Sequence, residues 1–341
     1  MELWRTTVSG SMRLQLISLS SNRAFDGVAI VSDGTRLAFV EDEDMIGTGD
    51  LDVPAQLILL RSDDSIGSSD FRGGSNGSAD TMLAEGNLRV WSNAFSPDDS
   101  QIVFVARAEG SPPAPTALWV VDAAYGAVPR RVTPEYPFVS QPAWLDANTL
   151  IFSPEQTPNV FTTTLQVDVS ATPPQPPEVL FDGGFVALSP DKTMLLVIRE
   201  PVGLNIAEDQ LFPYALVSLA GDTPQILQEW QLPLGEFAWS PDSAMLAQSD
   251  IGGVLRLLRL DDGTTEELLR LNPLVENISH LTWSADSRGL IYVFNDTSGD
   301  ANAPREVYQL DLADGTSNLI VSGANDDFSE VLIAPPASTE P

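Results

Sequence analysis

The sequence predicts an all-β fold, a β-propeller with four-stranded blades, and two observations support this prediction. A short apolar run that ends in a turn with an aspartate occurs six times, and successive copies lie 44 to 65 residues apart. A period near this length that is made of strands is typical of propeller blades. The chain also has 26 prolines and 24 glycines, which indicate frequent turns and little room for long helices. The six aspartates are Asp33, Asp98, Asp146, Asp191, Asp242 and Asp286.

The residues before each aspartate fit the innermost strand of a blade. Small side chains suit the strand at which blades converge, and a large apolar neighbour is expected to pack between adjacent blades. Such a pair occurs in every copy, at Ala29-Ile30, Ala94-Phe95, Ala143-Trp144, Ala187-Leu188, Ala238-Trp239 and Thr282-Trp283. We therefore interpret the three tryptophans as core residues, with a sugar-stacking platform as the alternative.

The turn itself has a role in this arrangement. Pro97, Pro190 and Pro241 fix the backbone torsion angle that a tight turn needs, and the following aspartate can accept hydrogen bonds from backbone amides. Apolar strands follow each turn, and glycine pairs such as Asp262-Gly263 mark later hairpins. Ser-Pro-Asp is thus predicted to close the hairpin between the first two strands of a blade.

The two ends of the chain have complementary strand patterns. Residues 3–8 and 12–19 precede the first repeat at the offset of outer strands, and residues 329–335 follow the last repeat where another inner strand is due. We expect a seventh, composite blade from both ends, because closing the ring would protect the exposed strand edges. A six-bladed ring with additional edge strands is the alternative. Residues 1–341 are expected to form one domain, with a tail at 335–341.

An insertion in the first repeat is a candidate recognition element. Residues 65–80 read SIGSSDFRGGSNGSAD, a run rich in glycine and serine that predicts a flexible surface loop. Loops on a rigid scaffold often carry recognition, so Phe71 and Arg72 are the candidate partner-binding residues.

The charge of the chain limits its partners. There are 48 acidic and 17 basic residues, which give a formal net charge of −31. Such a field repels phosphate backbones, so no nucleic acid partner is expected, and a protein partner with a basic or cationic surface is favoured. No segment approaches the 18 or more consecutive apolar residues of a membrane span.

The residues that most enzymes need are scarce. The chain has no cysteine and one histidine, His280, which the pattern places at the entrance of a strand. A Ser-His-Asp triad would have this residue as its one possible base, and metal sites rich in histidine or cysteine are excluded. Nucleotide-binding loops are also absent from the sequence. The chain is therefore predicted not to be an enzyme.

Two acidic segments, residues 41–52 and 295–302, could supply oxygen ligands to calcium, and each follows the second strand of a blade. Neither fits the EF-hand pattern, and clusters are expected in so acidic a chain. We expect solvated loops and no cofactor, with calcium binding as the alternative. The candidate calcium ligands are Asp42, Asp44, Asp50, Asp52, Asp296 and Asp300.

FAWSPDS at 237–243 and NAFSPDD at 93–99 resemble the repeat of the TolB-like, WD40-like (Pro-Asp repeat) β-propeller family, and the resemblance extends over residues 28–323. This resemblance implies a propeller that serves as a protein-binding platform, commonly in the bacterial envelope, or as a non-catalytic domain attached to hydrolases.

We therefore predict a non-catalytic protein-binding or scaffold propeller of the bacterial cell envelope or surface. Extracytoplasmic localisation, in the periplasm or at the cell surface, is favoured over the cytoplasm. A leader is expected to have been removed, because the chain opens inside a strand pair. One alternative is a carbohydrate-active enzyme, a lyase or glycosidase that depends on carboxylates and calcium. The second alternative is a self-assembling structural surface protein.

Overall fold

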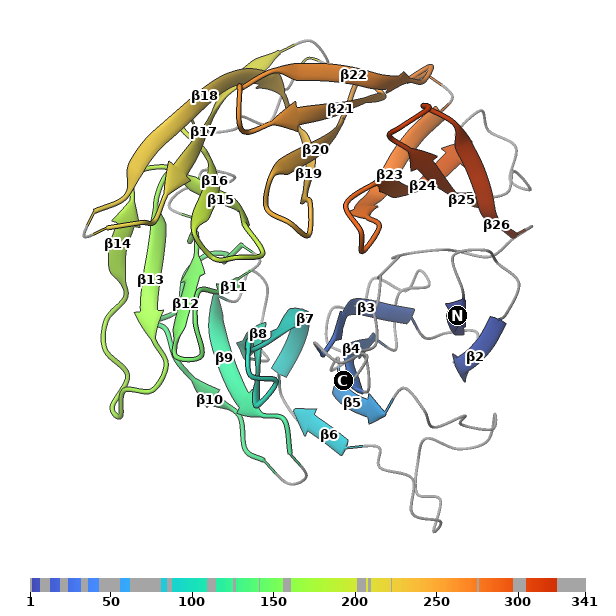
Figure 1. The fold of residues 1–341 in the computed structure, drawn as a ribbon. Helices are drawn as coiled ribbons and strands as arrows, with labels where there is room; N and C mark the ends of the chain where they lie inside the picture. Colours follow the sequence, from blue (N-terminus) through green and yellow to red (C-terminus); the bar gives the residue numbers. More distant parts are fainter. Residues whose placement is uncertain are drawn as a thin grey trace, which may run out of the picture. The chain divides into compact units, whose positions relative to one another are not determined.

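The computed structural model describes most of the chain, and every regular element in the described part is a strand (Figure 1). The described residues are 2–6, 13–18, 24–31, 36–42, 56–61, 81–84, 88–108, 115–124, 127–140, 142–155, 161–200, 207, 210–221, 223–274, 276–296 and 305–323. Six sheets have four strands each, in the order of the chain, and a seventh has two. We call the four-stranded sheets blades 1 to 6.

The blades follow one another along the chain, as the repeat predicts. Blade 1 comprises β3 (Ala24–Ile30), β4 (Arg36–Asp42), β5 (Gln56–Arg61) and β6 (Thr81–Ala84). Blade 2 comprises β7 (Leu88–Phe95), β8 (Gln101–Ala108), β9 (Thr116–Asp122) and β10 (Arg130–Arg131). Blade 3 comprises β11 (Ala143–Trp144), β12 (Thr149–Phe152), β13 (Thr164–Asp168) and β14 (Glu178–Phe181).

The second half of the chain repeats this plan. Blade 4 comprises β15 (Gly184–Leu188), β16 (Met194–Ile198), β17 (Leu211–Ser218) and β18 (Gln225–Pro233). Blade 5 comprises β19 (Gly235–Trp239), β20 (Met245–Asp250), β21 (Val254–Arg259) and β22 (Thr265–Arg270). Blade 6 comprises β23 (Glu276–Trp283), β24 (Gly289–Asp296), β25 (Arg305–Asp311) and β26 (Ser317–Gly323).

The ends of the chain are described in part. β1 (Glu2–Thr6) and β2 (Arg13–Ser18) form the antiparallel two-stranded sheet. The expected inner strand at 329–335 lies outside the described residues, so the composite seventh blade stays a prediction.

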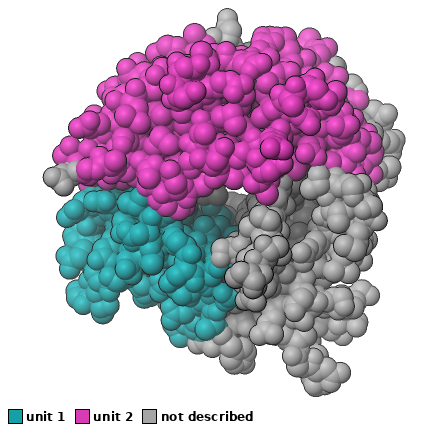
Figure 2. Space-filling view, in the orientation of Figure 1, with its two compact units in different colours: residues 1–158, 165–178, 334–341 teal, residues 159–164, 179–333 magenta. Residues whose placement is uncertain are grey.

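Two compact units divide the chain (Figure 2). Unit 1 consists of residues 1–158, 165–178 and 334–341, and unit 2 consists of residues 159–164 and 179–333. Blades 1 and 2 belong to unit 1, whereas blades 4, 5 and 6 belong to unit 2. We describe each unit by itself, and the prediction of one domain over the whole chain stays a prediction.

Apolar layers between consecutive sheets make the core of each unit. In unit 1, one cluster joins blade 1 to blade 2 and another joins blade 2 to blade 3. In unit 2, Trp239 packs in the layer between blades 4 and 5, and Trp283 packs between blades 5 and 6. Trp144 and Trp283 are each 3% exposed. The tryptophans of the repeat are therefore core residues, as the sequence predicts.

The tryptophan of one blade also bonds the blade before it. Trp144 Nε1 donates to the carbonyl of Ala94 at 3.1 Å, and Trp283 Nε1 donates to the carbonyl of Ala238 at 3.0 Å. The small and large residues of the repeat thus form one recurring contact, in which the small residue lets the next blade's indole approach its backbone.

The Ser-Pro-Asp segments close the first hairpin of blades 2, 4 and 5, as predicted, and the first turn of blade 1 lies outside the described residues. In blade 5, Ser240 Oγ donates to Asp242 Oδ1 at 2.7 Å and accepts from the backbone of Met245 at 2.9 Å. Blades 2, 4 and 6 repeat this pair of bonds. The degenerate turn of blade 3 keeps the aspartate, since Asp146 accepts from two backbone amides at 2.8 and 2.9 Å. The serine and the aspartate therefore replace backbone hydrogen bonds that a tight turn leaves unmade.

Candidate functional site

Most of the candidate residues from the sequence lie outside the described residues. These are Phe71, Arg72, Asp44, Asp50, Asp52 and Asp300. Asp42 is the last residue of β4 and Asp296 is the last residue of β24, so both acidic segments follow the second strand of a blade as predicted. In the described part of the chain, no group of three or more acidic, histidine or cysteine residues is placed to hold a metal ion. Calcium binding and the recognition role of the insertion stay predictions.

A candidate surface lies at one end of blade 5. We call it the blade-5 rim and define it as residues 234–236, 250–253, 270–274 and 276. It lies at the end of the sheet opposite the Ser-Pro-Asp turn, where β19 begins and β20 ends. Residues 251–253 alone join β20 to β21 there, whereas residues 199–210 and 297–304 make the equivalent connections of blades 4 and 6.

Backbone hydrogen bonds fix the shape of the blade-5 rim. The N–H of Ile251 donates to the carbonyl of Leu234 at 3.1 Å, and the N–H of Gly253 donates to the carbonyl of Asp250 at 3.1 Å. The N–H of Leu271 in turn donates to the carbonyl of Gly253 at 2.9 Å. The three segments of the rim are therefore joined to one another.

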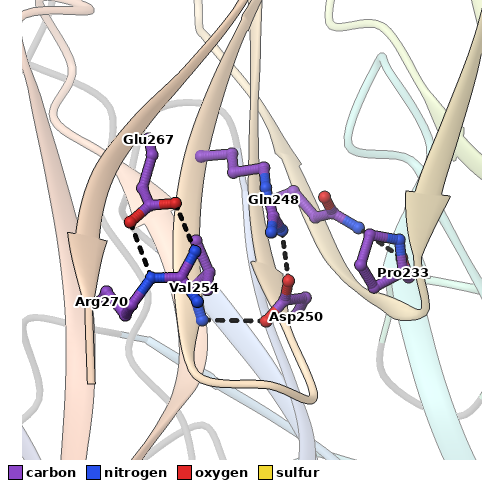
Figure 3. A network of polar contacts seen from close by, with 7 residues as sticks. Pro233, Gln248, Asp250, Val254, Glu267 and Arg270 are labelled. Atoms are coloured by element: carbon purple, nitrogen blue, oxygen red, sulfur yellow. Dashed lines mark hydrogen bonds and ion pairs between the residues drawn. The ribbon is translucent and has the colours of Figure 1, made fainter. Parts of the chain in front are cut away.

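A buried ion pair lies next to the short connection at residues 251–253 (Figure 3). The side chain of Asp250 is 2% exposed and pairs with the guanidinium of Arg256, whose side chain is 18% exposed. The other carboxylate oxygen of Asp250 accepts the N–H of Val254 at 2.8 Å. One carboxylate thus closes the turn and neutralises a neighbouring strand's arginine.

A second ion pair lies on the outer strand of the same blade. Glu267 accepts two bonds from the guanidinium of Arg270, at 2.6 and 2.9 Å (Figure 3). The bond to Arg270 lowers the pKa of the Glu267 carboxyl, and the charges of Arg270 and Arg256 add to this effect. Arg256 and Arg270 therefore each form an ion pair with a carboxylate.

Glu236 connects blade 5 to blade 6. Its Oε1 accepts the N–H of Leu281 at 3.2 Å, next to His280. Burial raises the pKa of the Glu236 carboxyl, and the backbone N–H groups of Leu281 and His280 oppose part of the rise. The residue as a whole is exposed, at the position where β19 packs beside β23.

His280 does not lie at the entrance of a strand, which corrects the sequence-based placement. It lies inside β23 with a φ of 51°, where the register with β24 shifts between Ser279 and Thr282. A β-bulge of this kind re-aims the backbone, here so that two N–H groups point at Glu236. Burial and then the charge of Arg305 lower the pKa of His280.

The raised pKa of Glu236 predicts a pH-dependent stability. The folded state holds this proton more tightly than the unfolded chain does, so ionisation costs stability once the pH rises through the raised pKa. Glu236→Gln keeps an oxygen acceptor without the charge. We expect its melting temperature to exceed that of the unchanged protein by about 1–2 °C at pH 7.5. The difference should disappear near pH 4, where the unchanged carboxyl is protonated. Glu178→Gln, at an exposed position of β14, is the control, and an equal gain in both variants would contradict the assignment.

Aliphatic side chains are exposed at the rim and beside it. Ile251 is 45% exposed and Leu274 is 80% exposed. Leu211, at the start of β17, is 53% exposed and lies opposite Pro233, the residue before the rim. These three side chains are on the same end of unit 2, because Leu211 begins β17 there and Ile251 and Leu274 lie in connections between strands at that end.

Solved structures of other proteins show which fold this is. TolB from Acinetobacter baumannii matches with a TM-score of 0.50 at 17% identity, over 77% of this chain and 58% of that chain. Prolyl oligopeptidase B from Galerina marginata matches with a TM-score of 0.56 at 10% identity, over 89% of this chain and 44% of that one. An oligogalacturonate lyase in complex with manganese matches with a TM-score of 0.51 at 11% identity, over 91% and 95% of the two chains.

The chain has a TolB-like β-propeller fold. The fold class predicted from the repeat is thereby confirmed, whereas the number of blades is not decided by these matches. The chain spans about half the length of the first two of these structures, and at such low identity the likeness concerns the fold alone. No protein-family model matches the sequence, and no curated protein matches it. In the described part of the propeller, no helix is long and apolar enough to cross a membrane.

The carboxylates of the propeller's blade-5 rim are engaged in structural bonds. Asp250 and Glu236 accept backbone N–H groups, and Glu276 accepts the N–H of Asn272 at 3.0 Å. A carboxylate that is held in this way orders the backbone and is poorly placed to exchange protons with a substrate. The arrangement therefore presents apolar side chains on a fixed backbone, which suits recognition.

The sequence analysis missed the blade-5 rim because it compared what the repeats share. The rim is marked by a difference between repeats, the length of the connection after the second strand. Asp250 is followed by Ile251-Gly252-Gly253, a connection of three residues where the neighbouring repeats have longer connections. Comparing connection lengths after the second strand would have singled out blade 5. The bond from Glu236 to the next blade has no sequence signal, because its partners are backbone groups.

Proposed function

We propose that this propeller is a non-catalytic protein-binding scaffold and that the blade-5 rim is part of its recognition surface. The observation that carries the proposal is the exposure of Ile251 and Leu274 on a rim held by a buried ion pair and by backbone hydrogen bonds. Apolar side chains on a rigid, loop-like surface contribute to protein interfaces because they lose water on binding at little cost in conformational entropy.

We also propose that the protein is located outside the cytoplasm. The resemblance of the Pro-Asp repeats to the TolB-like family supports an extracytoplasmic place, in the periplasm or at the cell surface. The net charge of −31 supports a protein partner with a basic surface, because such a field attracts cationic groups and repels nucleic acid.

Site-specific photo-crosslinking tests the proposal directly. A benzophenone amino acid replaces Leu274 in one variant and Val128 in a control variant, and both are irradiated in the cells that make the protein. Val128 is 83% exposed in unit 1, which matches the 80% exposure of Leu274. A discrete adduct with another protein at position 274, absent at position 128, is the expected result.

Other outcomes would contradict the proposal. Adducts of the same kind at both positions would indicate contact without a specific surface. No adduct at either position would mean that the rim has no partner in the cell. An adduct between two copies of this chain would favour the self-assembling surface protein.

A further inference from the structure

We infer that a recurring β-bulge in the outermost strand of blades 1, 4, 5 and 6 keeps copies of this chain from pairing edge to edge. The bulges lie in the fourth strand of each sheet, away from the blade-5 rim. The inference goes beyond the proposed function, because it concerns assembly of the chain with itself and excludes one route to it.

The bulge is visible in the register between the third and fourth strands. In blade 5, Leu255 of β21 pairs with Leu269 of β22. The next residue of β21, Arg256, pairs with Glu267, so Leu268 is an extra residue in the ladder. The same shift occurs between the third and fourth strands of blades 1, 4 and 6. The extra residues of the four blades are Leu83, Leu227, Leu268 and Ile320.

The bulge has a fixed place in three of these blades. In blades 1, 5 and 6 the shift lies beside the second-strand residue that is six positions after the turn aspartate. These residues are Phe39, Gln248 and Tyr292. In blade 4 the shift lies beside Leu195 and Leu196, nearer the turn. Because the outermost strands differ in sequence, this recurrence indicates a common structural requirement of the blade.

The bulge brings two adjacent aliphatic residues to one face of the sheet. In a regular strand, neighbouring side chains point to opposite faces. In β22, however, Leu268 and Leu269 both pack on the core cluster that joins blades 5 and 6. In β26, Ile320 and Val321 both belong to the cluster of β24, β25 and β26. The strand bends at such a point and its twist increases, so an incoming strand would meet an interrupted row of backbone groups.

The outermost strands are the places where such an interruption matters. In the described part of the chain, each bulged strand has one hydrogen-bonded neighbour, the third strand of its own sheet. The far edge of a strand of this kind can pair with another molecule, and proteins prevent this with bulges, charges or very short strands. Blade 2 uses the latter two, because β10 consists of Arg130 and Arg131, which are both exposed.

Among the bulged strands of unit 2, β26 depends most on its bulge. Its sequence, SNLIVSG, has no charged residue, whereas β22 contains Glu266 and Glu267 and β18 contains Glu229. Leu319 of β26 is 51% exposed, so the strand also presents apolar surface. Ile320 divides β26 into two runs that are shorter than the usual strand of about five residues.

Deleting Ile320 from the full chain tests the inference. The deletion joins the two halves of β26 into a regular strand, in which Leu319 and Val321 keep their partners in β25. We expect the variant to associate with itself, so that its mass rises with concentration beyond that of the unchanged protein. Size-exclusion chromatography with multi-angle light scattering measures this mass. High ionic strength is used, because it screens the charge repulsion between such acidic chains.

Matched variants separate the loss of the bulge from the loss of a side chain. Ile320→Ala keeps the bulge, so its mass should equal that of the unchanged protein. Adding Leu319→Lys to the deletion places a charge on the regular strand and should reverse the association. Circular dichroism establishes that each variant folds. If the Ile320 deletion does not fold, deletion of Leu227 makes the same test in blade 4, with Leu227→Ala as its control. Leu227 is 56% exposed, so its removal loses little packing.

Three outcomes would overturn the inference. A folded deletion variant with the mass of the unchanged protein at every concentration would show that the bulge does not prevent pairing. Equal association of the deletion variant and its alanine control would attribute the effect to lost packing. Association that persists after Leu319→Lys would place the contact on another surface. None of these outcomes affects the crosslinking at position 274, so this inference and the proposed function can fail separately.

Discussion

Replacing Asp250 with alanine is expected to lower the free energy of unfolding by about 3–5 kcal/mol, because it leaves a largely buried arginine without its partner. The Arg256 guanidinium cannot reach bulk water easily, since its side chain is 18% exposed. The substitution also removes the acceptor for the N–H of Val254, which closes the turn at residues 251–253. Urea unfolding, followed by tryptophan fluorescence, measures the loss.

Two companion variants make this prediction specific. Glu266→Ala removes a surface ion pair with Arg259, whose side chains are 57% and 46% exposed, and should cost less than about 1 kcal/mol. Asp250→Leu combined with Arg256→Met removes both charges and should recover much of the stability, because no uncompensated charge stays behind. If Asp250→Ala costs no more than Glu266→Ala, the ion pair does not support the blade-5 rim.

The repeat made most of the fold predictable, because its information is local and occurs several times. Ser240, Pro241 and Asp242 lie next to each other and form their turn from their own side chains, so aligned copies sufficed to predict the hairpin. The packing of Trp283 was also predictable, because a tryptophan in the same column of three repeats favours a shared structural position over a sugar-stacking platform.

The candidate site was less predictable, because it depends on contacts between segments far apart in the sequence. Glu236 meets the backbone of Leu281, and the bulge at His280 that presents this backbone has no local signal in the sequence. The acidic segments at 41–52 and 295–302 were candidate sites because of their composition. Composition does not show which carboxylates form hydrogen bonds or ion pairs within the fold. The buried carboxylate of the blade-5 ion pair, Asp250, is a single acid at the end of β20 and is not part of an acidic cluster in the sequence.

The same reasoning identifies Gly235 as the position where a small change should have a large effect. A methyl group on this residue would lie 2.3 Å from the carbonyl oxygen of Ser249 and 2.9 Å from the Cα of Asp250. Both neighbours are backbone atoms of β20, so the clash cannot be relieved by a side-chain rotation. Gly184, at the same position of β15, has its own backbone neighbour at 2.3 Å, the carbonyl oxygen of Phe161. The inner strands of blades 4 and 5 thus begin with a glycine because another backbone segment is too close for a side chain.

Gly235→Ala is therefore expected to lower the free energy of unfolding by about 3 kcal/mol, at the upper end of overpacking costs, because β19 must move away from β20. The shift would also displace Glu236 and the backbone of Leu234 that holds Ile251, so crosslinking at position 274 should fall even in molecules that fold. Gly315→Asn is the control, because Gly315 has a φ of 71°, which asparagine tolerates, and no atom near enough to clash. If the two variants unfold at the same urea concentration, β19 and β20 are not as close as described, and the rigidity of the blade-5 rim has another origin.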